Sequence, residues 1–337
     1  MPTPLLALAP MEGVADADLR AALTAIAGGG NYAWGVSPFV RVTNSLLPER
    51  AFQRVCPELR AGGRTPDGTP MRVQLLGSDP ACLAANAAHL ATLEPAGVDL
   101  NFGCPAPTVN RHRGGAALLA EPDLLWRIAT AVRAAVPRGI PFTAKMRLGL
   151  EDDRPALECA LALQAGGVEA LIVHGRTRAE GYRPPARWTA IARVREALRI
   201  PVIANGEVWT AADHAAIQRE SGCEQVMLGR GALADPLLPR RIQGLADERI
   251  APEDWHEVYA ALSDYWAKVC RRLPPKHAPG RLKQWLSWLR RAYPQADALH
   301  RLLRPLTTPE AVDAVLGGRN QESGIRRQSG AVHLWNQ

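Results

Sequence analysis

The sequence predicts an α/β protein, built as a (β/α)8 TIM barrel followed by a small all-helical C-terminal domain. Three observations predict it. Short apolar segments alternate with Ala/Leu/Arg-rich stretches of helical period over the first part of the chain. Eight such units occupy about 245 residues, close to the ~250 residues that this barrel usually takes. Strand-like segments then disappear from Pro252 onward.

The eight strand candidates are continuous apolar runs without strict alternation, which is typical of parallel strands buried on both faces. A doubly wound sheet also uses such strands, but eight regular units favour closure into a barrel. The candidates are residues 5–10, 32–39, 71–77, 97–103, 141–149, 170–175, 200–206 and 225–229.

Helical patterns lie between these strands. One begins near Asp79, and another follows Glu121 with Pro122 at an early helical position and apolar residues at helical spacing. The other candidates between strands are residues 155–166, 188–199, 210–221 and 235–246.

The C-terminal part reads as helices separated by Pro or Gly, at residues 252–272, 281–293, 295–304 and 308–316. We therefore expect a barrel domain over 1–248 and a helical domain over 249–316. The remainder, 317–337, is polar and Gly-rich, and we expect it to be poorly ordered.

Composition excludes several classes of protein. The chain has 337 residues, of which 47% are hydrophobic and 22% charged, as in a globular protein. Its six cysteines are scattered without a CxxC motif, which argues against a disulfide scaffold and a zinc ribbon and fits a reducing cytoplasm. The longest apolar run, 5–11, is far shorter than the ~18 residues that a membrane span needs, and no signal peptide is visible. We expect no metal site and no membrane contact.

The charge is uneven. The net charge is +7, and residues 268–304 hold ten basic residues against the single acid Asp297. Such a run can be a solvated helical face, or a surface for a polyanion. The missing acidic partners, and Trp285 and Trp288 interleaved with Arg281 and Lys283, favour nucleic acid.

Polar residues lie within or directly after seven of the predicted strands, toward the end where barrels of this kind carry their active sites. Any one of them could be a turn residue, but seven together indicate a functional site. They are Pro10 to Gly13, Gln74, Asn101 to Pro105, Lys145 with Arg147, His174 to Thr177, Asn205 to Glu207, and Gly229 to Gly231.

Lys145 lies inside an apolar run, so it is either buried at a cost or points into a polar cavity. A flavin offers a reason for it, because an ammonium beside the N1–C2=O edge stabilises the charge that reduction adds there. The loops NGE and GRGAL, with Arg230, suit a phosphate after the last two strands. GRGALA also matches a dinucleotide fingerprint, but no further strand follows, so we interpret it as a mononucleotide phosphate site.

Cys104 stands between Gly103 and Pro105, just past a strand. Most lone cysteines are small apolar fillers. At the mouth of a barrel, a thiol with an ordinary pKa near 8.5 is mostly protonated and can donate a proton.

Together these motifs resemble the tRNA-dihydrouridine synthases. The motifs are APMEGV, VQLLG, GVDLNFGCP, KMRLG, VHGRT, IPVIANGE and MLGRGAL, and the resemblance spans about residues 5–316. The tail sequence RLKQWLSWLRR, with FVRV (39–42) and GYR (181–183), is similar to the branch called C in bacteria. One departure is the basic stretch 111–115, which is either a further RNA contact or a variable loop.

The resemblance implies an enzyme in which NADPH reduces FMN and the flavin then reduces the C5–C6 double bond of a uracil base in tRNA. The branch implies uridine 16 of the D-loop. The cofactor residues implied are Pro10, Met11, Glu12, Gln74, Lys145, His174, Asn205, Gly206, Glu207, Gly229 and Arg230. Cys104 would be the proton donor. The substrate residues implied are Asn101 and Arg147 at the base, Arg176 and Tyr182 near the RNA, and Arg41, Arg281, Lys283 and Trp288 for holding tRNA.

Two other interpretations stay open on the residues alone. One is a flavin barrel reductase of a small pyrimidine or enone, which has no need of a basic helical appendage. The other is a non-catalytic tRNA-binding protein, which has no need of the strand-end residues. No pyridine-nucleotide motif is visible, so we expect hydride to arrive in the same cavity. We expect a cytoplasmic monomer.

Overall fold

The computed structural model describes residues 6–111 and 113–322. Eight parallel strands close into a barrel in chain order, each paired with the next and β8 paired with β1. The predicted TIM barrel is therefore confirmed. The strands are β1 Leu6–Leu8, β2 Trp34–Arg41, β3 Met71–Leu76, β4 Val98–Phe102, β5 Phe142–Arg147, β6 Ala170–His174, β7 Val202–Asn205 and β8 Gln225–Leu228.

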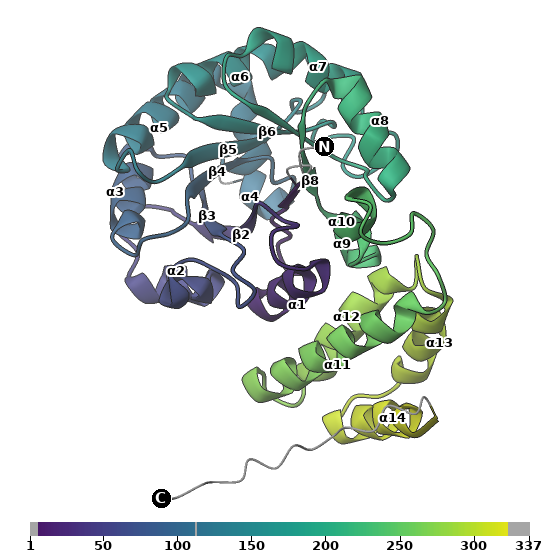
Figure 1. The fold of residues 1–337 in the computed structure, drawn as a ribbon. Coiled ribbons are helices and arrows are strands. Elements are labelled where there is room, and N and C mark those ends of the chain that lie inside the picture. The colour runs from purple at the N-terminus through teal and green to yellow at the C-terminus, as the bar shows by residue number, and fades with distance from the viewer. Residues whose placement is uncertain (1–5, 112, 323–337) are drawn as a thin grey trace, which may run out of the picture. The chain divides into compact units, whose positions relative to one another are not determined.

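Helices surround the strands (Figure 1). The main ones are α1 Ala17–Ala27, α2 Glu49–Val55, α3 Pro80–Ala91, α5 Pro122–Ala135, α6 Ala156–Ala165, α7 Trp188–Ala197 and α8 Ala211–Ser221. The short ones are η1 Pro57–Ala61, α4 Pro107–Asn110, η2 Gly115–Ala120, α9 Arg230–Ala234 and α10 Leu238–Ile242. Helices α1, α2 and α4 were not among those expected. Within the expected helix 235–246 only the short α10 forms, and α9 precedes that range.

Helix ends follow from local side chains. The Asp79 carboxylate accepts a hydrogen bond from the Cys82 amide at 2.6 Å, and Pro80 occupies the first turn of α3. Thr210 and Asp213 form a reciprocal capping box on α8, which ends at Gly222 in the left-handed region. The start of α3 agrees with the helix expected to begin near Asp79.

The chain divides into two compact units between Val258 and Tyr259, inside α11, rather than at 248. The second unit contains the rest of α11 (Asp254–Arg272) and α12 Ala278–Leu289, α13 Pro294–Leu303 and α14 Pro309–Glu322. Its core includes Tyr265 and Trp285, whose rings meet edge to face at 5.2 Å. Helix α14 continues past residue 316, where a poorly ordered tail was expected to begin. Residues 323–337 of that tail lie outside the described residues.

Candidate active site at the barrel mouth

The ends of β5 and β7 hold an ammonium group in place. Lys145 Nζ donates a hydrogen bond to Asn205 Oδ1 at 2.9 Å. The amide nitrogen of Asn205 in turn donates to the Met227 carbonyl at 2.8 Å, which fixes the amide so that its oxygen faces Lys145. The pKa of Lys145 falls to about 7, mainly because it is buried and also because the Arg147 charge is near. The ammonium is thus held firmly and gives up its proton easily.

His174 lies at the end of β6 and is 6% exposed. Burial first, and then the charges of Lys145 and Arg147, hold the pKa of His174 well below its ordinary value, so the imidazole is neutral near pH 7. Gly206 packs directly against it, with a φ of +122°, and a Cβ there would lie 2.8 Å from His174 Cδ2. Only glycine fits this turn.

The loop that carries Cys104 is held by hydrogen bonds from three sides. Asn101 Oδ1 accepts from the amides of Gly103 at 3.0 Å and Cys104 at 2.8 Å, while its Nδ2 donates to Gln74 Oε1 at 2.7 Å. Asn110 Nδ2 donates to the Cys104 carbonyl at 2.9 Å. Burial raises the pKa of the Cys104 thiol, so the thiol is protonated at neutral pH. This arrangement can donate a proton from a fixed position.

Arg147 completes that support. It is 2% exposed, and its guanidinium donates to the carbonyls of Gly103 at 2.8 Å, Thr177 at 2.9 Å and Gly181 at 2.8 Å. It was expected to face a substrate base. Its hydrogen bonds instead join the loop after β4 to the loop after β6, so it acts on Cys104 through the backbone.

Tyr182 stands over two guanidinium groups at this mouth. Its ring centroid is 5.2 Å from the Arg147 guanidinium carbon and 4.4 Å from that of Arg230, which also faces the Trp209 ring at 5.4 Å. Both are in cation–π range. Tyr182 is 54% exposed, which suits its expected place near a large substrate.

Arg176 corrects an expectation. It was expected near RNA, but it is fully buried and donates to the Glu207 carboxylate and, at 2.7 Å, to the Arg183 carbonyl. Glu207, expected at the cofactor, also accepts from the Ala186 amide at 2.5 Å. A buried charge needs its partners, and here the two side chains satisfy each other. This pair shapes the loops after β6 and β7.

The other expected residues lie around the same strand ends. Pro10, Met11 and Glu12 form the turn after β1, in which the Met11 carbonyl accepts from the amides of Val14 and Ala15. Arg41 ends β2 in an exposed position, and its charge lowers the pKa of Cys104 while that of Glu12 raises it.

Gly229 and Arg230 lie between β8 and the start of α9. The next residue, Gly231, is required by a close approach, because a Cβ there would lie 2.0 Å from the Val208 carbonyl oxygen. In the basic stretch 111–115, Arg113 is bonded to Glu121 at 2.6 Å, and residue 112 lies outside the described residues.

The structure of the helical unit changes the interpretation of the basic run at residues 268–304. Lys283 Nζ donates to the carbonyls of Arg304 at 3.0 Å and Leu306 at 2.5 Å, so it closes the end of α13. Trp285 is fully buried in the core, which makes its expected role between surface cations wrong. Trp288 is half-buried on α12, and Arg281 donates to Gln284 at 2.6 Å. The exposed cations are Arg271, Arg272, Lys276, Arg290, Arg291, Arg301 and Arg304.

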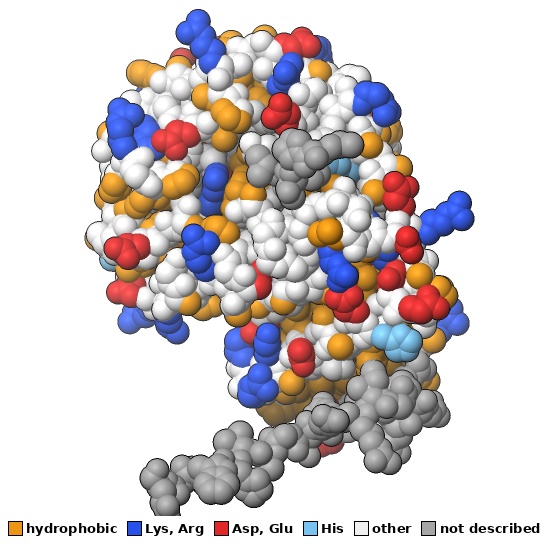
Figure 2. Space-filling view, viewed as in Figure 1, with side chains coloured by type: hydrophobic (Ala, Val, Ile, Leu, Met, Phe, Trp, Pro, Cys, Tyr) orange, Lys and Arg blue, Asp and Glu red, His pale blue; other side chains and the backbone are white. Residues whose placement is uncertain are grey.

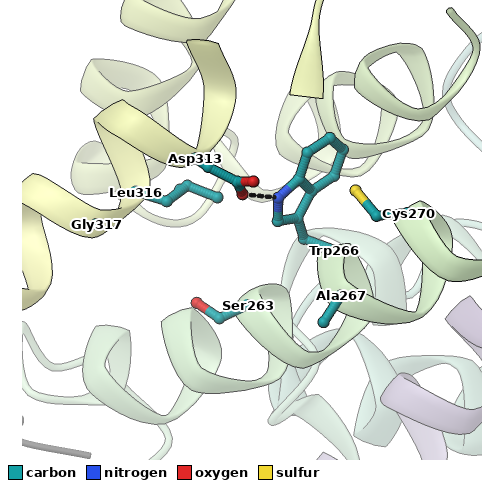
Figure 3. Close-up of a pocket in the computed structure, with 7 residues that line it drawn as sticks. All are labelled: Ser263, Trp266, Ala267, Cys270, Asp313, Leu316 and Gly317. Atoms are coloured by element: carbon teal, nitrogen blue, oxygen red, sulfur yellow. Dashed lines mark hydrogen bonds between the residues drawn. The ribbon is translucent and has the colours of Figure 1, made fainter. Parts of the chain in front are cut away.

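On the face seen in Figure 2, the Lys and Arg side chains of the barrel alternate with Asp and Glu. The helical unit also holds a cavity of about 520 Å³, between α11 and α14. Figure 3 shows Trp266 beside it, with its indole nitrogen donating to Asp313 at 2.7 Å. Its lining is mostly apolar and carries none of the strand-end residues.

Sequence reasoning found Gln74 but missed its polar neighbours one layer below Lys145. Asp99 and Thr143, like Gln74, are each at most 1% exposed, and Arg72 stacks on the Trp34 ring at 3.8 Å. The signal was available, because Asp99 interrupts an apolar strand in the same way as Lys145 does.

Two further searches cover only the described part of the chain. In residues 6–111 and 113–322, no three His, Cys, Asp or Glu side chains are grouped so as to hold a metal ion. None of the helices in those residues combines the length and the apolar character that a bilayer crossing requires.

Comparison with known proteins gives consistent results. Residues 7–322 match the family model for dihydrouridine synthases. Three relatives are named tRNA-dihydrouridine(16) synthase. That of Ralstonia nicotianae is 55% identical, covering 89% of this chain and 91% of its own. That of Pseudomonas putida is 49% identical, covering 93% and 96%, and that of Vibrio cholerae 45%, covering 90% and 93%.

Two solved structures share the fold at low identity. Histamine dehydrogenase from Rhizobium sp. 4-9 has a TM-score of 0.55 at 12% identity, over 78% of this chain and 48% of its own. A 2-naphthoyl-CoA reductase has a TM-score of 0.52 at 11% identity, over 69% and 49%. At such identity the likeness concerns the fold alone.

Proposed function

Since this chain belongs to the dihydrouridine synthase family, we propose that it reduces uridine 16 of tRNA to 5,6-dihydrouridine, with FMN as cofactor and NADPH as reductant. The position follows the name that its relatives carry. The observation that carries the proposal is the position of Cys104, whose backbone amide and carbonyl are held by hydrogen bonds at the same strand ends that present Lys145.

The residues at the barrel mouth fit a flavin. The amide nitrogen of Gln74 is buried without a hydrogen-bond partner, as a donor awaiting an acceptor would be. Lys145 presents an ammonium, and Arg230, next to Gly229 at the start of α9, suits a phosphate. FMN, when bound, would supply the hydride that is added to C6 of uracil and would recover it from NADPH.

Cys104 would supply the other half of the reduction. Its thiol proton goes to C5 as hydride reaches C6, so the double bond gains two hydrogens and the resulting thiolate regains a proton from solvent. Asn101 and Arg147 position the thiol by holding the Gly103–Cys104 backbone. Because burial keeps the pKa of Cys104 raised, the proton is present at neutral pH until the substrate needs it.

Exposed cations of the helical unit would hold the tRNA phosphates. Arg271, Lys276 and Arg304 belong to this group. Phosphate contacts of this kind position the RNA and supply binding energy to extrude the target base from its stack. Tyr182, exposed above Arg147 and Arg230, is suited to stack on that base.

The test is a purified holoenzyme, NADPH and two tRNA transcripts, one with uridine and one with cytidine at position 16. We expect flavin absorbance in the protein, and dihydrouridine at position 16 of the first transcript only. Cys104→Ala should lower the rate of dihydrouridine formation about 100- to 10,000-fold while keeping flavin content and NADPH oxidation. Cys82→Ala is the matched control, since that thiol lies on α3 and bonds to the Ser45 carbonyl. A colourless protein, or full activity of Cys104→Ala, would overturn the proposal.

A further inference from the structure

The interior of the barrel has a polar side and an apolar side. Ladder partners in neighbouring strands point to the same face of a sheet, as do alternate residues of one strand. Trp34 belongs to the interior cluster, which otherwise consists of Ala7, Ala9, Val36, Ile172, Ile203 and Met227. Val36, a member of this cluster, is the ladder partner of Arg72. Gln74, two residues after Arg72, pairs with Asp99, and Asp99 pairs with Thr143. The polar side chains of β3, β4 and β5 therefore point into the same interior.

Most polar atoms of this side lack hydrogen-bond partners. They are Asp99 Oδ1 and Oδ2, Arg72 Nε and Nη1, Gln74 Nε2 and Thr143 Oγ1. Burying a carboxylate is costly, and a buried ion pair contributes little stability over an apolar core. The cost therefore points to a use of the Asp99 charge rather than to packing.

Lys145 lies one layer nearer the mouth than Asp99. Thr143, the ladder partner of Asp99, precedes Lys145 by two residues on β5, so Asp99 and Lys145 point inward in successive layers. The other charged or titratable groups around this mouth are Arg72 on β3, Arg41, Cys104, Arg147, His174, Tyr182, Arg230, Arg176 with its partner Glu207, and Glu12. Asp99 itself is an acid whose charge raises the pKa of Lys145.

The two groups perturb one another. Burial raises the pKa of Asp99 to about 7, against the opposing charges of Arg72 and Lys145. Burial and the Arg147 charge lower the pKa of Lys145 to about 7, against the opposing charge of Asp99. Two interacting groups that titrate together share their protons as a pair.

We propose that Asp99 is a positioning residue that governs whether Lys145 carries its proton while the flavin is reduced. This inference rests on the proposed function, since it concerns the group that Lys145 would face. The ammonium matters when negative charge arrives at the N1–C2=O edge of the flavin, and Asp99 is the buried anion that keeps the ammonium charged at that moment. Thr143 assists by lying beside the carboxylate, where it lowers the pKa of Asp99.

The experiment measures the flavin reduction potential of the holoenzyme against pH. Where Lys145 loses its proton, the slope of the potential against pH should change, which gives a break in the curve. Lys145→Met should abolish this break, which would assign the break to Lys145. Asp99→Asn should move the break to lower pH by about one unit, because removing a neighbouring opposite charge weakens the proton affinity of Lys145 roughly tenfold. Thr143→Val, a smaller change, should move it in the same direction by less, because Asp99 then ionises less readily.

Glu58→Gln is the matched control. Glu58 is also a buried carboxylate, but it pairs with Arg20 at 2.7 Å, beside α1 and away from the strand ends. It should lower stability and leave the break where it is. A wild-type protein without flavin would overturn the proposed function and this inference with it. Two results would overturn this inference alone. One is a wild-type break that stays at the same pH in Asp99→Asn, and the other is a wild-type curve in which Lys145→Met abolishes no break.

Discussion

The buried cations of the barrel and the exposed cations of the helical unit use positive charge in opposite ways. In the barrel, Arg20, Arg147 and Arg176 are at most 2% exposed, and each guanidinium is bonded to carbonyls or a carboxylate. In the helical unit, seven of the ten cations between 268 and 304 are exposed. Buried cations give up water and must be bonded to fixed partners, so they hold loops in one geometry. Exposed cations keep their water and act together as a salt-sensitive field.

The largest effect on the unfolding free energy should come from the buried pair of Arg176 and Glu207. Arg176→Met removes a guanidinium that is 0% exposed and leaves the carboxylate of Glu207 bonded to the Ala186 amide. Breaking a buried pair from one side costs about 3–5 kcal/mol of unfolding free energy, which urea unfolding would measure.

Two companion variants make that test specific. Arg176→Met with Glu207→Gln should cost clearly less than the sum of the two single changes, because the uncompensated charge is gone. Arg113→Met removes one partner of an exposed ion pair in the same unit and should change stability little. Equal costs for Arg176→Met and Arg113→Met would break the distinction between buried and exposed charge.

A smaller effect, but one with a distinctive pH dependence, should come from Asp99. Its folded pKa is raised to about 7 from 3.8, so the folded protein binds more protons than the unfolded chain between those values. Its contribution to stability therefore falls as pH rises from about 4 to about 7. Each unit of difference between the folded and unfolded pKa is worth about 1.4 kcal/mol.

Unfolding free energies of Asp99→Asn and the wild type, measured across that pH range, test this expectation. The free energy of Asp99→Asn relative to the wild type should rise with pH, by at most a few kcal/mol, and level off above about pH 7. A constant difference across the range would show that Asp99 stays ionised in the folded protein.

Lys283 sharpens the comparison because it lies in the helical unit yet resembles the barrel cations. Lys283→Met removes two hydrogen bonds from a charged donor to the Arg304 and Leu306 carbonyls, and should cost about 2 kcal/mol of unfolding free energy. The salt dependence of tRNA affinity should not change. Lys276→Met, at an exposed site in the same unit, should leave the unfolding free energy nearly unchanged and reduce the salt dependence of tRNA affinity. A reduced salt dependence in Lys283→Met would return this residue to the tRNA surface.

The strands and their polar ends could be predicted from sequence because burial on both faces leaves a direct trace, a continuous apolar run ended by Gly, Asn or a charge. The test applied to Lys145 would also have found Asp99, which stands between Val98 and Leu100. Helix α2 was missed because seven residues are too few to show a period.

The partners of the cations could not be predicted. A cation looks the same in sequence whether it bonds to its own chain or to solvent, and the answer depends on segments distant along the chain. Arg176 is held by Glu207, and Lys283 by the carbonyls of Arg304 and Leu306. Trp285 was misread for the same reason, since its partner Tyr265 lies on another helix.

The smallest effect on stability should come from the exposed cations themselves. Replacing Arg271, Lys276 and Arg304 by Ala should change the unfolding free energy by no more than about 0.5 kcal/mol each, because exposed side chains lose little when truncated. The same triple variant should bind tRNA more weakly, and the slope of log affinity against log salt should decrease by about 0.7–0.9 for each phosphate that the variant no longer neutralises. Binding to tRNA over a salt series, with flavin content as the control, measures both. If the slope is unchanged, the phosphates are held elsewhere and the exposed charge of the helical unit has another use.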